Sequence, residues 1–146
     1  MKIEVFKENL RNAMLFLPDQ LANNAGDAME DARRTFVSKF QRDRLNFPKS
    51  GPVQPKDGGL RRVTGSLSRS FQSRTWRGNL DHLKTSHWSA GVPYARIHEF
   101  GDNSRGIPPR LGFYSSWEDH IHNDLMPRLE RATAKTIKDA GFKSRI

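Results

Sequence analysis

Two groups of residues in this sequence have the types that could do chemistry, and both contain histidine. In the first, His120 and His122 lie close to Glu118, Asp119 and Asp124, and all five are side chains that can bind metal ions. On a helix, ligands that share a face are three or four residues apart, so two pairs in this group have workable spacing. The sequence supplies no third ligand for either pair. We therefore expect a solvated helix face here, with a metal-dependent enzyme as the less favoured alternative.

The second group lies in residues 94–110, where His98 and Glu99 could form an acid–base pair. Adjacent side chains usually point apart, and this stretch offers no nucleophile and no oxyanion donors. The serines of TGSLSRS, at 64–70, lack a nucleophile-elbow pattern, and the stretch also lacks the spacing and the lysine of a phosphate-binding loop. We therefore expect no enzymatic activity and no cofactor.

The net charge of +9 is concentrated in residues 47–80, which contain seven Lys or Arg and one Asp. A basic segment of this kind favours an anionic partner, either nucleic acid or an acidic protein face, although a solvated loop rich in Gly, Pro and Ser has the same composition. Phe71 and Trp76 are expected to be core residues, with the arginines around them in water. The residues predicted to bind this anionic partner are Arg61, Arg62, Arg69, Arg74 and Arg77. Changing all five to Ser should weaken attachment of the chain to that partner while leaving the fold intact.

The composition is that of one domain with a modest core. The chain has 146 residues, of which 35% are hydrophobic and none is cysteine. The absence of cysteine excludes a disulfide framework and cysteine-based zinc sites, and it is typical of a reducing cytoplasm. We expect no membrane-spanning segment and no signal peptide, because the sequence has no long unbroken apolar run.

Apolar residues recur at helical spacing through the first forty residues. Pro18 is expected to break this run into two helices or to open the second one. We expect the second helix to pack on one side only, because Glu30, Arg33, Arg34 and Lys39 form a polar far face. Residues 46–60, with three prolines and three glycines, are predicted to be a long flexible loop.

The rest of the chain is predicted to contain a small sheet and a C-terminal helix. Thr64 can cap a short helix that carries Leu67 and Phe71 on its inner face. Residues 72–92 are interpreted as two strands joined by a turn, after which Pro93 opens a turn or short helix. The residues from 114 onward are helical, with a break expected near Asp124. Residues 141–146 form a basic tail, and the whole chain, 1–146, is predicted to be a single α+β domain.

An ordered set of short motifs in this chain resembles the tail-completion, or virion-morphogenesis, proteins of tailed bacteriophages, which are small neck and minor tail proteins. The motifs are TGSLSRSF at 64–71, VPYA at 92–95, IHEFG at 97–101 and IPPR at 107–110, followed by a helix. In layout the resemblance covers about residues 1–140, and it is close over 60–71 and 92–113. The chain departs from the family after Arg110, where Leu111-Gly112-Phe113 replaces the usual Pro-Phe-Leu and places the aromatic residue one position later.

The resemblance implies a non-enzymatic structural protein of the virion tail or neck, assembled in the host cytoplasm. It implies a ring of identical subunits, most often a hexamer, around the DNA channel, which completes the tail and joins it to the head. The implied partners are tail terminator or tail tube proteins, head-completion or connector proteins, and possible contact with phage DNA. The alternative is a small basic nucleic-acid-binding protein that uses residues 47–80.

The resemblance also implies structural roles for the motif residues. Tyr94 and Phe100 would be anchors in the core or at a subunit boundary, and Gly101 would allow a turn that other residues disfavour. Arg96, Glu99 and Arg110 would form ion pairs or hydrogen bonds that fix the loop or bridge neighbours, and Pro108 with Pro109 would stiffen the return to the last helix. The predicted fold and interface residues are Thr64, Gly65, Leu67, Tyr94, Glu99, Phe100, Gly101, Pro108 and Arg110.

Overall fold

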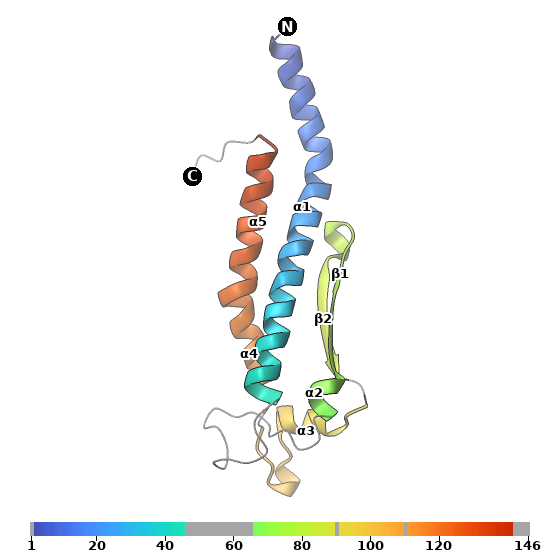
Figure 1. Cartoon of the computed structure of the whole chain (residues 1–146), viewed down its shortest axis with the longest axis vertical. Coiled ribbons are helices and arrows are strands. Elements are labelled where there is room, and N and C mark those ends of the chain that lie inside the picture. The colour runs from blue at the N-terminus through green and yellow to red at the C-terminus, as the bar shows by residue number, and fades with distance from the viewer. Residues whose placement is uncertain (1, 46–65, 90, 110, 142–146) are drawn as a thin grey trace.

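The computed structural model describes residues 2–45, 66–89, 91–109 and 111–141, and, within residues 2–14, the backbone alone. It confirms the α+β class, with a long N-terminal helix, a two-stranded antiparallel sheet and a C-terminal helix (Figure 1). Several predictions lie outside the described residues: the loop at 46–60, most of the basic tail, and the roles given to Arg61, Arg62, Thr64, Gly65 and Arg110.

Helix α1 is one continuous element, Lys2–Phe40, so the prediction that Pro18 divides it was wrong. A proline within a helix removes one backbone donor and crowds the carbonyl four residues earlier. Pro18 is exposed, so water can reach the backbone group that loses its partner, and helical residues continue on both sides. A π-helical turn, Gln41–Leu45, follows α1 and ends on the buried Leu45.

The predicted pair of strands is confirmed as an antiparallel hairpin of β1, Phe71–Trp76, and β2, Lys84–Ser89. The short helix α2, Ser66–Ser70, leads directly into β1, so Phe71 opens the strand and does not share a helix face with Leu67. Leu67 is buried, as predicted. A 3-10 turn at Leu80–His82 joins the two strands beyond the Gly78-Asn79 break.

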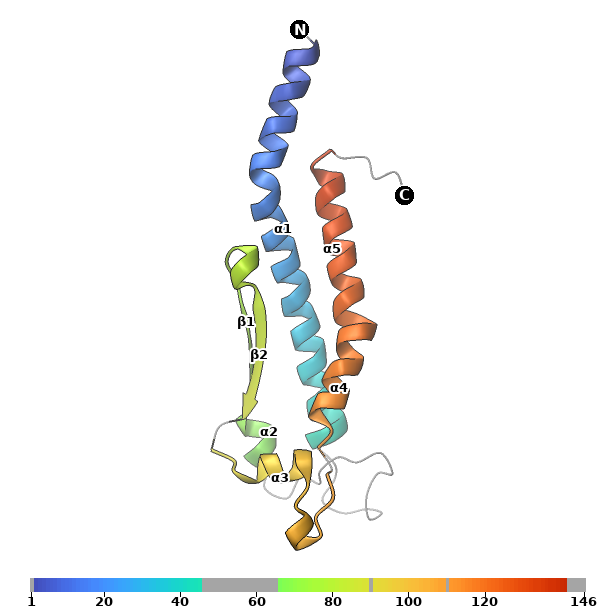
Figure 2. The same ribbon diagram turned by 180° about the vertical axis from the view of Figure 1, so that it is seen from behind.

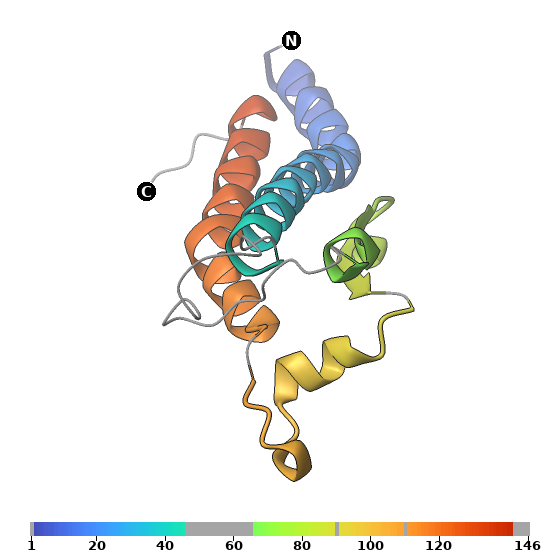
Figure 3. The ribbon, with the colours of Figure 1, turned by 60° about the horizontal axis from the view of Figure 1, so that its bottom comes forward.

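Helix α1 lies between two layers (Figures 1–3). The hairpin covers one side and α5, Met126–Asp139, covers the other, while α4, Phe113–His120, packs against both α1 and β2. The prediction that this helix packs on one side only was therefore wrong. The side chains of Glu30 and Arg33, expected on a solvated face, are only 17% and 18% exposed, because the hairpin covers them.

The prediction of a break near Asp124 was wrong, because a π-helical turn, Ile121–Leu125, connects α4 to α5 without interrupting the helix. Its wider geometry is seen at Met126, whose N–H donates to the carbonyl of Ile121, five residues earlier. Pro127 follows in the first turn of α5, as predicted. The wide turn gives room for the proline ring, which would otherwise meet the carbonyl of the preceding turn.

The core has two parts of different character. At the end where α1 meets α2, β1 and α4, it is aromatic and includes the buried Phe36 and Phe40 with Leu45, Leu67 and Leu111. Between α1 and α5 the buried residues are small, chiefly Ala25, Ala32 and Thr136. Within the part of the chain that the structure describes, no helix is both long and apolar enough to cross a membrane.

Candidate functional site

The motif at 94–101 forms a tight corner at one end of the molecule. Helix α3, Tyr94–Phe100, begins after Pro93 and ends at Gly101, whose φ of 77° confirms the predicted need for glycine. A β-carbon at Gly101 would also lie 2.8 Å from the carbonyl oxygen of Ile107 and 3.0 Å from Cδ of Pro109. Both the backbone conformation and the close approach of the returning chain therefore require glycine at this position.

The loop after Gly101 is held by its own backbone and side chains. Asp102 and Ile107 exchange two backbone hydrogen bonds of 2.8 and 2.9 Å. The carboxylate of Asp102 accepts from the backbone N–H and the hydroxyl of Ser104, and these bonds, led by the hydroxyl, lower the pKa of Asp102. Asn103–Arg105 is an exposed 3-10 turn between them. The loop therefore has a defined shape that faces outward.

Glu99 forms hydrogen bonds that connect α3 to the start of α4. Its two carboxylate oxygens accept hydrogen bonds from the backbone N–H groups of Phe113, at 2.8 Å, and Tyr114, at 3.0 Å. These donors are at the start of α4, where Gly112 has no side chain to cap them, and a carboxylate there also interacts favourably with the helix dipole. Glu99 thus fixes α3 to α4 through hydrogen bonds to backbone.

Three aromatic side chains of this corner are exposed: Tyr94 by 40%, Phe100 by 63% and Tyr114 by 62%. The alternative that places Tyr94 and Phe100 in the core of the chain was wrong, and a place at a subunit boundary stays a prediction. The rings of Phe100 and Tyr114 are 5.9 Å apart between centroids. They border an apolar pocket of about 220 Å³ whose walls include Leu67 and Leu111. We call Tyr94, Phe100 and Tyr114 the corner aromatics.

Phe113, which the sequence places one position later than the family pattern, reaches the core. Its ring lies 5.7 Å from Phe36 and 5.4 Å from Phe40. Leu111, which precedes Gly112, is buried, and its N–H donates to the carbonyl of His98 at 2.8 Å. The departure from the family pattern is thus compatible with a packed junction between α3 and α4.

Two histidines belong to the aromatic core. His120 is 8% exposed and lies near the rings of Phe36 and Trp117, whereas His122 is exposed. His87, on the inner face of β2, lies 4.5 Å from Trp117 and 5.1 Å from Phe36 between centroids. Burial lowers the pKa of both, that of His87 to about 4. Among the described residues, no three His, Asp or Glu side chains are grouped so that they could hold a metal ion.

The basic and aromatic residues of the hairpin divide by strand alternation. Phe71 faces α1 and packs in the core, as predicted, but Trp76 is 40% exposed, so its prediction as a core residue was wrong. Trp76 and Arg74 are two residues apart in β1, and the guanidinium lies 4.0 Å from the centroid of the indole ring. The six residues on this side form what we call the outer hairpin face: Gln72, Arg74, Trp76, Lys84, Ser86 and Trp88.

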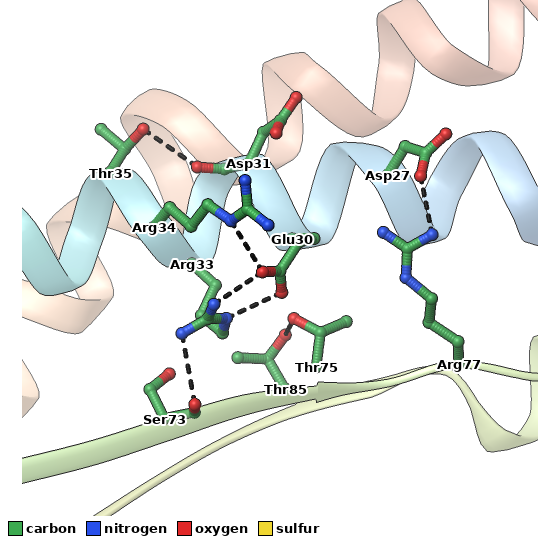
Figure 4. Close-up of polar contacts among 10 residues, drawn as sticks. All are labelled: Asp27, Glu30, Asp31, Arg33, Arg34, Thr35, Ser73, Thr75, Arg77 and Thr85. Atoms are coloured by element: carbon green, nitrogen blue, oxygen red, sulfur yellow. Dashed lines mark hydrogen bonds and ion pairs between the residues drawn. The ribbon is translucent and has the colours of Figure 1, made fainter.

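The opposite face of the hairpin meets α1 through polar groups, which we call the polar seam (Figure 4). Arg33 donates to both carboxylate oxygens of Glu30 and to the carbonyl of Ser73. Hydrogen bonds from Arg33 are the main cause that lowers the pKa of Glu30 to about 2. Arg77 pairs with Asp27 at 2.7 Å.

The described arginines of the predicted basic site therefore do not form one cluster. Arg77 belongs to the polar seam, Arg74 to the outer hairpin face, and Arg69 is exposed in the last turn of α2. Sequence reasoning missed Lys84 and Trp88, which complete the outer hairpin face. Their four-residue spacing in a strand places them on one side, and that signal was available in the sequence.

No protein-family model, curated protein or solved structure matches this chain.

Proposed function

We propose that this protein is a structural subunit of a tailed-phage virion, which completes the tail and joins it to the head as part of a ring around the DNA channel. The observation that carries the proposal is the corner at α3. The motif residues that resemble the phage family shape the backbone of this corner. The carboxylate of Glu99 caps the start of α4, and Gly101 allows the chain to turn back after α3. What the corner presents to the outside is aromatic.

A second feature supports an assembly role. Helix α1 extends beyond the ends of both α5 and the hairpin (Figures 1 and 2). Leu15 and Phe16, in the N-terminal half of this helix, are 62% and 60% exposed. Large apolar side chains are therefore exposed both at the corner and on α1. Exposed apolar surface of this kind is typical of subunits that bury it against neighbouring proteins. In the proposed setting the neighbours are tail terminator or tail tube proteins, head-completion or connector proteins, and copies of the chain itself, assembled in the host cytoplasm.

The test is electron microscopy of lysates from a phage that lacks this gene, with and without purified protein. We expect separate filled heads and unattached tails, which join when the wild-type chain is added. A Phe100→Ser, Tyr114→Ser chain should fold but fail to join them, because it lacks the aromatic surface. Met126→Ser removes an exposed apolar side chain, 46% exposed, from the start of α5, and it should join heads and tails normally.

Two outcomes would contradict the proposal. Normal virions formed without the gene would rule out the joining role. Full joining by the Phe100→Ser, Tyr114→Ser chain would exclude the corner aromatics as the contact surface and remove the observation on which the proposal depends.

The outer hairpin face supports a second candidate function, single-stranded nucleic-acid binding. Its two tryptophans could stack on bases, while Arg74 and Lys84 contact phosphates. The discriminating measurement is fluorescence anisotropy of a labelled oligonucleotide over a range of salt concentrations. This function requires an affinity that falls steeply as salt rises, because binding would release counterions from the phosphates.

A further inference from the structure

Two surfaces of the molecule, the outer hairpin face and the exposed side of α4, carry opposite charge. On the first, there are two cations, Arg74 and Lys84, and none of the six residues is acidic. On the other, the segment from Phe113 through Leu125 contains Glu118, Asp119 and Asp124 and no Lys or Arg. Asp124 pairs with Arg128 at 2.8 Å, so Glu118 and Asp119 remain as exposed carboxylates, with no ion pair to any other described residue.

The outer hairpin face has the features of a protein-binding surface in addition to its charge. Trp76 and Trp88 are 40% and 41% exposed, and tryptophan and arginine are the residues most enriched at energetically important interface positions. Arg74 and Lys84 both lie against the ring of Trp76, at 4.0 and 5.5 Å from its centroid. These contacts order the ring before binding, which lowers the entropy cost of an interface.

The α4 surface has the complementary features. His120 and Trp117 point toward α1 and the core, so the exposed Glu118 and Asp119 lie on the side of α4 away from it. In Figure 3, α4 and the hairpin lie beside different faces of α1 near its C-terminal end. The ring of Trp117 on α4 also lies 4.5 Å from that of His87 on β2, so the inner sides of the two elements are in contact. A chain with two different, complementary surfaces can bind a second copy head to tail, and this type of interface generates rings when the rotation closes.

We infer that the outer hairpin face of one copy of this chain binds the Glu118–Asp119 surface of α4 on the next copy. This inference rests on the proposed function, because it names the contact between neighbours in the proposed ring. The occupant is a second copy because the same chain supplies both charges, on two separate surfaces that both face away from α1. Arg74 and Lys84 pair with Glu118 and Asp119 across the interface, and Trp76 and Trp88 are covered by it.

The test uses two charge-reversed full-length chains and sedimentation velocity at low salt. The first chain, Arg74→Glu with Lys84→Glu, is acidic on both surfaces, and the second, Glu118→Lys with Asp119→Lys, is basic on both. For each variant alone, the dissociation constant of self-association should rise at least tenfold above that of the wild-type chain. An equal mixture should assemble again, because every hairpin then meets an α4 surface of opposite charge. Unchanged helical content and unfolding midpoint of each chain show that the fold is retained.

Disulfide crosslinking tests the same contact with a smaller change in its charge than the charge-reversed chains carry. The chain has no cysteine, so Ser86→Cys on the outer hairpin face and Asp119→Cys on α4 introduce the only thiols. Mild oxidation should link chains carrying both changes into multimers, and should link chains that each carry one change only when the two are mixed. The matched control pairs Ser86→Cys with Lys138→Cys, an exposed position near the end of α5, and should give no ladder.

Several results would overturn the inference: a wild-type chain that stays monomeric at all concentrations, a first variant that assembles like the wild type, or a mixture that fails to assemble. A first variant that loses only oligonucleotide binding would assign the outer hairpin face to nucleic acid instead. The joining experiment is independent of these results. Head–tail joining by chains that do not crosslink would reject this interface but keep the proposed function, and crosslinked rings that do not join heads to tails would reject the function but keep the interface.

Discussion

Two regions of α1 contact the rest of the chain through opposite chemistry. Near Phe40 the helix packs through aromatic rings, with Phe36 in contact distance of Phe40, Phe113 and Trp117. A few turns earlier, at the polar seam, it meets the hairpin through Glu30, Arg33 and the Asp27–Arg77 pair. Apolar packing provides most of the stability of a fold, whereas hydrogen-bonded charges fix a relative orientation at small net gain.

One helix therefore separates two roles along its length: stabilising the fold at its aromatic end and orienting the hairpin at the polar seam. The aromatic end should determine whether the chain folds, because each ring there buries a large apolar area. The polar seam should determine how the hairpin lies on α1, and therefore where the outer hairpin face points. Removing a side chain from the aromatic end should therefore lower the free energy of unfolding strongly. Removing one from the polar seam should change the orientation of the hairpin on α1, with a smaller loss of stability.

Phe36→Ala should give the largest effect, because Phe36 is 2% exposed and contacts aromatic rings from β2 and α4 as well as Phe40. A buried Phe→Ala change costs about 3–5 kcal/mol of unfolding free energy, which is a large part of the stability of a small domain. Urea unfolding followed by circular dichroism measures it. A loss below about 1 kcal/mol would show that the aromatic end is not the main source of stability.

Glu30→Gln should have the next largest effect, and its size should depend on pH. Arg33 holds the pKa of Glu30 at about 2, against 4.5 for an ordinary Glu. Its contribution is therefore fully present above pH 4.5 and is lost as pH falls toward 2. We expect a loss of about 2 kcal/mol at pH 7 that disappears near pH 2. An equal loss at both pH values would contradict the ionic role.

His87→Phe should affect stability mainly below neutral pH. Burial, with smaller contributions from the charges of Arg33 and His120, holds the pKa of His87 at about 4, against 6.5 in an unfolded chain. The unfolded chain therefore takes up a proton as pH falls from 6.5 to 4, and the folded chain loses stability over this window, on the order of 1–2 kcal/mol. The Phe variant should show a flatter stability curve there. A curve parallel to that of the wild type would reject this account.

Arg77→Ser should give the smallest change, because both partners of the Asp27–Arg77 pair are more than half exposed. Exposed ion pairs contribute about 0–1 kcal/mol, and salt screens them. Arg74→Ser, which removes the same side chain from the outer hairpin face, is the matched control for stability. We expect thermal unfolding to detect at most a small loss for Arg77→Ser in low salt and none in high salt.

The sequence predicted the elements better than it predicted their surroundings. Periodicity identified the helices and alternation identified the hairpin, because both patterns are local properties of the chain. The polar residues Glu30 and Arg33 suggested a solvated face, since no local signal shows that a hairpin forty residues later covers them. The motif pattern drew attention to Glu99, but its hydrogen bonds to Phe113 and Tyr114 depend on the path of the chain between them.

The length of α1 has a consequence for hydrogen exchange. Its 39 residues span about 58 Å, and the N-terminal part extends past every other described element. A helix segment without tertiary contacts opens with a free energy near zero, whereas amides beside Phe36 should exchange only when the domain unfolds. Protection should therefore rise along this single helix from its start toward Phe40. If neighbouring subunits cover the extension, assembly should slow exchange there first, which makes the start of α1 an internal reporter of ring formation.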